Sequence, residues 1–219
     1  HFDGDIALSQ IASSLTTINL TEADAAIIDE AETITGNAGT LTVNIGNSST
    51  DANGDLDGTL TVTDGTASAT TDTVNIVNKA KLSTGANVDI FTASDLTSTG
   101  YENVNINTGA GTGVDELDLP TLTITPDSTS AAVSLTVTGT NSLHIDTSLT
   151  TTSTGLMTVD ASGMTAQAAG TSTLTIDSTS HGTSGTGSIT GSAGDDVIAI
   201  GAFKTTISGG AGNDSLTGG

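Results

Sequence analysis

The chain has 219 residues, and 25 acidic residues against 3 lysines give it a formal net charge of -22. Lys79, Lys81 and Lys204 cannot form the basic surface that a phosphate backbone or an anionic lipid headgroup requires, which excludes nucleic-acid and membrane binding. No apolar run is long enough to span a bilayer, and the residues after His1 lack the pattern of a secretory signal. We therefore expect a soluble piece of protein with no membrane insertion.

The composition also limits how the chain is stabilised. It has no cysteine, which excludes disulfides and thiolate metal ligands. Its many carboxylates repel each other, and a bound divalent cation would offset that repulsion. A merely acidic surface, of the kind found in halophilic proteins, is the alternative, and both interpretations stay open at the level of composition.

Small β-forming residues and few aromatic ones favour a thin, repetitive β fold. Aromatic residues make up 2% of the chain and hydrophobic residues 34%. A core built on large rings is therefore excluded, whereas the stacked coils of a β-solenoid bury only a few aliphatic side chains each. Regular alternation of these residues argues against disorder. The expected fold class is all-β, a β-solenoid with one short helix near the N-terminus.

That helix is predicted over Leu20 to Glu32. Thr21 is placed as its N-cap with Asp24 three residues later, an arrangement typical of a helix start. Ala25, Ile28 and Ala31 follow at helical spacing. We expect a short, partly buried helix that decorates the β structure.

A first candidate calcium loop follows the helix. The run Asn53-Gly54-Asp55-Leu56-Asp57-Gly58 matches the start of a D-x-D-x-D-G loop, and Asp64 stands at the twelfth position. The expected metal ligands are Asn53, Asp55, Asp57 and Asp64. Flanking strands and an aspartate in place of the usual glutamate differ from a helix-loop-helix site. An ordinary hairpin turn is the alternative interpretation.

Period-two alternation from residue 41 onward predicts a series of strands separated by Gly, Asn, Asp and Ser clusters. They are expected at Leu41–Ile45, Leu60–Val62, Val74–Ile76, Val88–Ile90, Val104–Ile106, Leu122–Ile124 and Val133–Val137. From residue 141 the strands end in aspartate, at Asp146, Asp160 and Asp177, and Asp196 and Asp214 continue the spacing. We expect these aspartates to form a ladder along one corner of a solenoid, with simple strand termination by Asp as the alternative.

The C-terminal segment contains two copies of a glycine-rich nonapeptide. Residues 209–217 read GGAGNDSLT, a full match to G-G-x-G-x-D-x-U-x, and residues 191–199 read GSAGDDVIA, with Ser192 in place of the second glycine. Glycines allow a tight turn with its carbonyls directed inward, and the aspartate adds a carboxylate. Oxygen ligands in irregular geometry favour Ca2+ over Mg2+.

This motif resembles that of RTX proteins, whose calcium-binding repeats occur in proteins exported by type I secretion. The resemblance implies a parallel β-roll over residues 182–219 in which two nonapeptides form one coil. Ile189, Ile198, Ile207 and Leu216 keep a nine-residue frame through the segment. Chance glycine-rich sequence is the alternative to an RTX relationship.

Within that frame, Asp196 and Asp214 fall on one edge of the roll, and the turns at 182–187 and 200–205 fall on the other edge without a carboxylate. The resemblance implies one Ca2+ between the turns that end at the two aspartates. The expected ligands are the carboxylates of Asp196 and Asp214 and the backbone carbonyls of the turns formed by Gly191, Gly194, Gly209, Gly210 and Gly212.

Catalytic groupings of residues are absent or weak. The chain contains neither a G-x-S-x-G nucleophile turn nor an H-E-x-x-H pair. His144 and Asp146 share one strand face, and the alternation of a solvent-facing strand explains this better than a catalytic role does. Glu116 and Asp118 could suggest a glycosidase, but with so few aromatic residues to stack on sugar rings we expect a solvated or ion-binding loop. We expect that the chain is not an enzyme.

The Thr-rich runs at 73–76 and 102–106 and the turn at 159–162 resemble calcium-dependent surface-layer proteins of Gram-negative bacteria. The resemblance implies a secreted protein on the bacterial cell surface that assembles with Ca2+ into a homo-oligomeric lattice or filament, with cell-surface polysaccharide as a further partner. A repeat module of a large RTX adhesin, or the C-terminal secretion domain of an RTX toxin or hydrolase, is the alternative.

The expected organisation has three segments. Residues 1–40 form a connector with the short helix, and residues 41–140 form Thr/Ser-rich β layers or an irregular solenoid. Residues 141–219 form a solenoid that ends in the RTX β-roll at 182–219.

Overall fold

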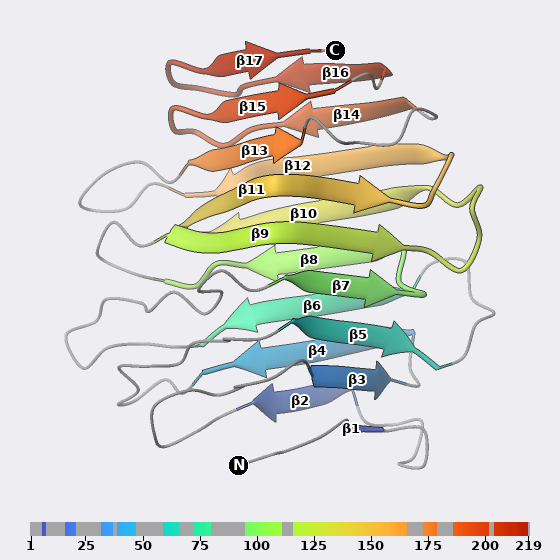
Figure 1. The fold of residues 1–219 in the computed structure, drawn as a ribbon. Coiled ribbons are helices and arrows are strands. Elements are labelled where there is room, and N and C mark those ends of the chain that lie inside the picture. Colours follow the sequence, from blue (N-terminus) through green and yellow to red (C-terminus); the bar gives the residue numbers. More distant parts are fainter. Residues whose placement is uncertain are drawn as a thin grey trace.

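The structure is a computed structural model. It describes residues 6–7, 16–20, 32–36, 39–46, 59–65, 72–79, 95–110, 116–165, 173–178, 186–201 and 204–218. In these ranges every element is a β-strand, and every strand pairing is parallel. Successive strands alternate between two sheets, so the chain winds as a solenoid (Figure 1). The predicted fold class is confirmed.

The odd-numbered strands form a nine-stranded sheet, called here the A sheet. Its members are β1 (Ile6–Ala7), β3 (Glu32–Gly36), β5 (Leu60–Asp64), β7 (Leu96–Thr99), β9 (Glu116–Thr125), β11 (Ser142–Thr151), β13 (Leu174–Ser178), β15 (Val197–Ile200) and β17 (Ser215–Thr217). The eight-stranded B sheet contains β2 (Thr17–Leu20), β4 (Thr40–Ile45), β6 (Thr73–Asn78), β8 (Asn103–Asn107), β10 (Val133–Gly139), β12 (Leu156–Met164), β14 (Thr186–Thr190) and β16 (Lys204–Ser208).

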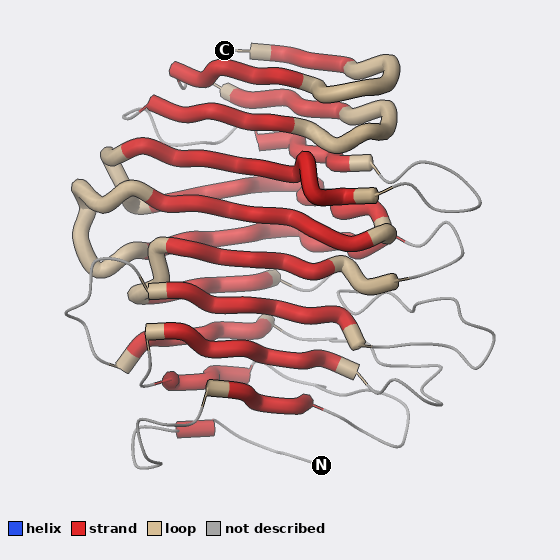
Figure 2. The backbone as a smooth tube through the Cα atoms, turned by 180° about the vertical axis from the view of Figure 1, so that it is seen from behind, coloured by secondary structure: helices blue, strands red, loops and turns tan. Residues whose placement is uncertain are grey.

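Two edges connect the sheets. The chain passes from the A sheet to the B sheet at the AB edge, which includes residues 100–102 and 126–132, and returns at the BA edge, which includes residues 191–196 and 209–214. Figure 2 shows the described turns gathered at these two edges. Because all strands of one sheet run in the same direction, each edge collects the turns of successive coils.

Aliphatic side chains fill the space between the sheets. Strands such as β5 and β6 alternate buried Leu, Val and Ile with partly exposed Thr and Asn, as the period-two pattern predicted. Among the described residues, Tyr101 is the one buried aromatic residue, and it is fully buried. The core is therefore thin and aliphatic, in agreement with the composition.

Polar side chains form ladders on the outer faces. Asn44 donates to Asn19 across 2.7 Å, Asn105 donates to Asn75 across 2.8 Å, and the hydroxyls of Thr123 and Thr150 lie 3.0 Å apart. Parallel in-register pairing brings equivalent side chains of adjacent strands together, so each row of outward side chains forms hydrogen bonds along the sheet. These ladders explain how a parallel sheet keeps one face in water.

Most predicted strands are confirmed, but the predicted helix is not. The helix expected over Leu20 to Glu32 is wrong at both ends, because Leu20 ends β2 and Glu32 begins β3. Strand pairing overrides the local helical pattern there, and residues 21–31 lie outside the described ranges. The strand expected at Val88–Ile90 also lies outside those ranges.

The single aspartate ladder is also wrong. Asp160 lies on β12 of the B sheet, whereas Asp146 and Asp177 lie on β11 and β13 of the A sheet. Asp196 and Asp214 immediately precede β15 and β17 of the A sheet, so they lie in turns at the BA edge and not on a strand. The regular spacing in the sequence therefore mixed aspartates of both sheets, and it mixed aspartates on strands with aspartates in turns. The division at residues 40 and 140 stays a prediction.

Substitution of one buried and one outward residue of β10 tests this account of the core. Leu135→Ala should lower the free energy of unfolding by about 2 to 5 kcal/mol, because Leu135 is fully buried between the sheets. Thr136→Ala, its outward neighbour, should cost less than about 1 kcal/mol. Urea titration followed by circular dichroism measures both, and equal costs would contradict the described alternation.

Candidate functional site

The two nonapeptide turns stack directly at the BA edge. Residues 191–196 connect β14 to β15, and residues 209–214 connect β16 to β17. The flanking strands pair in register, with Ile189 opposite Ile207 and Ile198 opposite Leu216. The predicted nine-residue frame is confirmed, and Asp196 and Asp214 occupy equivalent positions of successive coils.

Asp196 is fully buried and holds its own turn together. Its Oδ1 accepts hydrogen bonds from the Leu174 backbone N–H at 2.6 Å and the Ser192 hydroxyl at 2.7 Å. Its Oδ2 accepts from the Ser192 backbone N–H at 2.7 Å. Burial raises the pKa of Asp196, although these hydrogen bonds act in the opposite direction by favouring the carboxylate. The carboxylate therefore ties its turn to the preceding coil.

Asp214 repeats part of this arrangement one coil later. Its Oδ1 accepts a hydrogen bond from the backbone N–H of Asp196 at 3.1 Å. Beside it, Asp195 Oδ1 accepts from the backbone N–H of Asn213 at 2.7 Å. Asp214 is only partly buried, so its carboxylate is the more accessible of the two. The structure thus brings Asp196 and Asp214 together as predicted.

Ser192 has a role that the sequence did not indicate. It stands where the nonapeptide has a second glycine, and its hydroxyl donates to Asp196 and accepts from the Gly194 N–H at 3.0 Å. The departure from the motif therefore adds two hydrogen bonds to the turn. The sequence feature that corresponds to this role is a hydroxyl residue four positions before an aspartate, and many turns share that spacing.

The glycines allow the turns to approach each other. Gly210 and Gly212 have φ of 103° and 121°, a region that residues with a side chain rarely adopt. A Cβ on either would overlap a carbonyl oxygen of the preceding turn, of Ser192 and of Gly194 respectively. Likewise, a Cβ on Gly191 would overlap the Gly209 carbonyl oxygen. Carbonyl oxygens from two coils are therefore packed beside the two aspartates.

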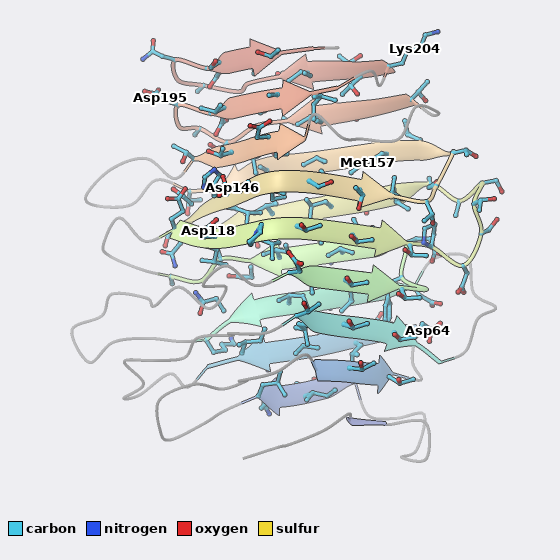
Figure 3. The ribbon with its side chains drawn as sticks, viewed as in Figure 1. Asp64, Asp118, Asp146, Met157, Asp195 and Lys204 are labelled. Atoms are coloured by element: carbon cyan, nitrogen blue, oxygen red, sulfur yellow. The ribbon has the colours of Figure 1, made fainter. Side chains whose placement is uncertain are left out.

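This edge offers oxygen atoms of the kind that hold a hard cation. A carboxylate has roughly four acceptor positions, and Asp196 uses three of them within the protein. Asp214 and the turn carbonyls are therefore the atoms best able to face an ion. Lys204 begins β16 at the other edge, as expected (Figure 3).

The upstream candidate loop is only partly described. Asn53, Asp55 and Asp57 lie outside the described residues, so their predicted role stays a prediction. Asp64 ends β5 at the AB edge, where 6% of its surface is exposed. It lies beside Asp72 and Asp127 rather than free in a hairpin, and these three carboxylates form one of two described groups that could hold a metal ion.

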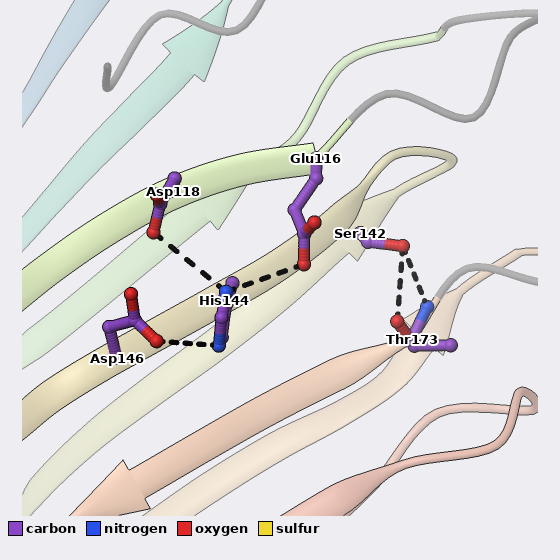
Figure 4. Close-up of polar contacts among 6 residues, drawn as sticks. All are labelled: Glu116, Asp118, Ser142, His144, Asp146 and Thr173. Atoms are coloured by element: carbon purple, nitrogen blue, oxygen red, sulfur yellow. Dashed lines mark hydrogen bonds and ion pairs between the residues drawn. The ribbon is translucent and has the colours of Figure 1, made fainter. Parts of the chain in front are cut away.

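The second such group lies on the outer face of the A sheet (Figure 4). Asp118 is the register partner of His144 on the neighbouring strand, and Asp146 follows two residues later. His144 Nε2 lies 2.8 Å from Asp146 Oδ1, and its Nδ1 lies 3.6 Å from Glu116 Oε1 and 3.8 Å from Asp118 Oδ1. Cross-strand register, which the sequence does not reveal, gathers these residues.

The chemistry open to this group is modest. The imidazole of His144 can bind a metal ion together with the carboxylates of Asp118 and Asp146. The side chains of Glu116, Asp118 and Asp146 are 51%, 41% and 49% exposed, which leaves the group open to water. Its position on an open sheet face therefore supplies acid and base groups without an enclosed substrate site.

Comparisons of the chain with protein-family models, with curated proteins and with solved structures find no match. Among the described residues, no helix has the length and hydropathy needed to cross a membrane.

A pair of glycine substitutions tests the stacked turns. Gly210→Ala should cost at least about 1 kcal/mol and reduce hydrogen-exchange protection across residues 191–218, because of its positive φ and the Ser192 carbonyl. Gly218→Ala is the matched control, because its Cβ would contact nothing within 4 Å. Unchanged protection in the Gly210 variant would show that the turns are not closely stacked.

Proposed function

We propose that the chain is a calcium-dependent structural protein of the RTX type, exported to the bacterial cell surface, where it assembles into a lattice or filament. The observation that carries this proposal is the pair of stacked glycine turns with Asp196 and Asp214. Their carbonyl and carboxylate oxygens suit Ca2+, and the nonapeptide match resembles RTX repeats.

Charge distribution supports calcium as the stabilising ion. The net charge is -22, and the two described lysines, Lys79 and Lys204, are far fewer than the carboxylates. An ion that binds only the folded chain stabilises it by mass action, by about 2.7 kcal/mol at a hundredfold excess over Kd. Such a contribution is a substantial fraction of the about 5 to 15 kcal/mol by which folded domains are usually stable.

The sheet faces support assembly between copies. Each outward residue described on β3, β5 and β7 is threonine, and those on β4, β6, β8 and β10 are mostly Thr, Asn or Ser. These two faces carry no described charge on those strands, whereas carboxylates lie at the edges and on the outer faces of β9 and β11 to β13. Two copies can approach through the neutral parts of the faces with little repulsion, while cations offset the charge of the edges.

Calcium and salt titrations test the proposed function. Light scattering and electron microscopy should show monomers in chelator and assemblies at saturating Ca2+. NaCl in chelator should not replace calcium, because screening supplies no directed oxygen coordination. Asp214→Asn should raise the calcium concentration needed for assembly. Asp177→Asn removes the same charge from an exposed position on β13 and should leave it unchanged.

Two outcomes would favour other functions. A chain that binds calcium but stays monomeric at every concentration would indicate a secretion domain or an adhesin module rather than a lattice subunit. Assembly that proceeds equally well in NaCl and chelator would exclude calcium as the assembly ion.

A further inference from the structure

Three carboxylates from distant parts of the sequence converge at the AB edge. Asp64 ends β5, Asp72 precedes β6, and Asp127 follows β9. One oxygen of each lies within 4.8 Å of the oxygens of the other two. Calcium–oxygen bonds are about 2.4 Å long, so ligands on opposite sides of one ion are separated by about 4.8 Å. A single calcium ion can therefore contact all three.

Two members of this group are buried, and a fourth carboxylate orders the backbone around it. Asp64 is 6% exposed, and Asp72 and Glu102 are 2% exposed. Glu102 Oε2 accepts from the Asp72 backbone N–H, and Oε1 accepts from the Asp127 backbone N–H, both at 3.1 Å. Glu102 is thus a positioning residue that fixes the segments carrying Asp72 and Asp127.

Two buried oxygens, one within the group and one beside it, have no hydrogen-bond partner. One is Asp72 Oδ2, and the other is the hydroxyl of Tyr101, whose residue is fully buried. The Tyr101 hydroxyl lies beside Gly36, the register partner of Asp64, and the charges of Asp64 and Asp72 add to burial in raising its pKa. An unpaired buried oxygen costs about 1 to 3 kcal/mol. A cation with its bound water would satisfy both atoms.

The neighbouring carboxylates also act on one another. Burial, a side-chain hydrogen bond with Asp64 and the charges of Asp64, Glu102 and Asp127 raise the pKa of Asp72 to about 6. The described lysines lie elsewhere. Lys79 follows β6 at the end opposite Asp72, and Lys204 begins β16 at the C-terminal end of the stack.

The backbone is shaped to let the carboxylates meet. Gly100 has φ of 83°, and a Cβ there would lie 2.8 Å from the Asp64 Cβ and 3.1 Å from Asp127 Oδ1. A Cβ on Gly39 would lie 3.0 Å from Asp72 Oδ1. Asp127 is exposed, so solvent reaches the group from one side.

We propose that Asp64, Asp72 and Asp127 bind one divalent cation of the size of calcium at the AB edge, with Glu102 positioning the ligands and Tyr101 facing the site. The site is separate from the stacked glycine turns, which lie at the BA edge. It does not depend on the RTX resemblance, and its test is independent of the proposed assembly.

Terbium luminescence tests this proposal directly. Tb3+ replaces Ca2+ at oxygen sites and emits when a nearby tyrosine is excited. The chain contains one tyrosine, Tyr101, and no tryptophan, so tyrosine-sensitised emission reports an ion bound near Tyr101. We expect saturable emission that Ca2+ displaces, and Tyr101→Phe should abolish the emission while calorimetry still detects calcium binding.

Ligand variants give the second readout. Asp127→Asn, at an exposed position where folding should be unaffected, should weaken Tb3+ and Ca2+ binding roughly tenfold or more. Asp72→Asn should weaken binding further. Asp118→Asn and Asp214→Asn remove equal charge from the A face and from the BA edge, and both should keep the emission titration of the unsubstituted chain.

The proposal is overturned if the folded chain, verified by circular dichroism, shows no sensitised emission. It is also overturned if the Asp127 and Asp72 variants titrate like the unsubstituted chain. A chain that binds no ion here but becomes more stable on Asp72→Asn would show that the carboxylates share only a proton. Loss of emission only in the Asp214 variant would move the ion to the glycine turns.

Discussion

In-register parallel stacking is the constraint on which this structure depends. Adjacent strands of one sheet lie about 4.8 Å apart, so each residue is placed beside its counterpart in the next coil. For the aliphatic residues between the sheets this arrangement builds a continuous core. For Asn and Thr on the outer faces it builds hydrogen-bonded ladders. For aspartates at the edges it places like charges close together, and that repulsion must be offset.

The two edges meet this requirement in different ways. At the BA edge, Asp196 accepts hydrogen bonds from backbone and hydroxyl groups, so the protein itself disperses much of its charge. At the AB edge, Glu102 is satisfied by two backbone N–H groups, while Asp72 keeps one unpartnered oxygen. Buried charge with incomplete hydrogen bonding is where a bound cation contributes most. Together with the uncharged outward side chains described on β3 to β8 and β10, these edges support the proposed function, a structural protein whose order and assembly respond to divalent ions.

Local patterns predicted the strands and the final turns well. Alternation of apolar residues located β4, β5, β6 and β10, and the nine-residue frame gave the pairing of Ile189 with Ile207. Both signals are carried by neighbouring residues. The helix expected between Leu20 and Glu32 failed because parallel pairing with β4 and β5 decides the structure of its end residues.

The acidic groups could not be predicted because no fixed period relates their members. Asp72 lies 8 positions after Asp64 and Asp127 lies 55 positions after Asp72, and the sheet register brings the three together. The same holds for Asp118 and His144, which are register partners on the adjacent strands β9 and β11. Asp64 was identified from a loop motif, but its described neighbours belong to other coils. The role of Ser192 was hidden because it departs from the glycine pattern.

Anomalous diffraction from crystals grown with calcium tests most directly the claim that stacked carboxylates are held by divalent cations. The account predicts difference peaks at both edges, one beside Asp214 and the stacked carbonyls of residues 191–194 and 209–212, and one among Asp64, Asp72 and Asp127. A well-ordered solenoid at saturating calcium with no peak at either edge would contradict it.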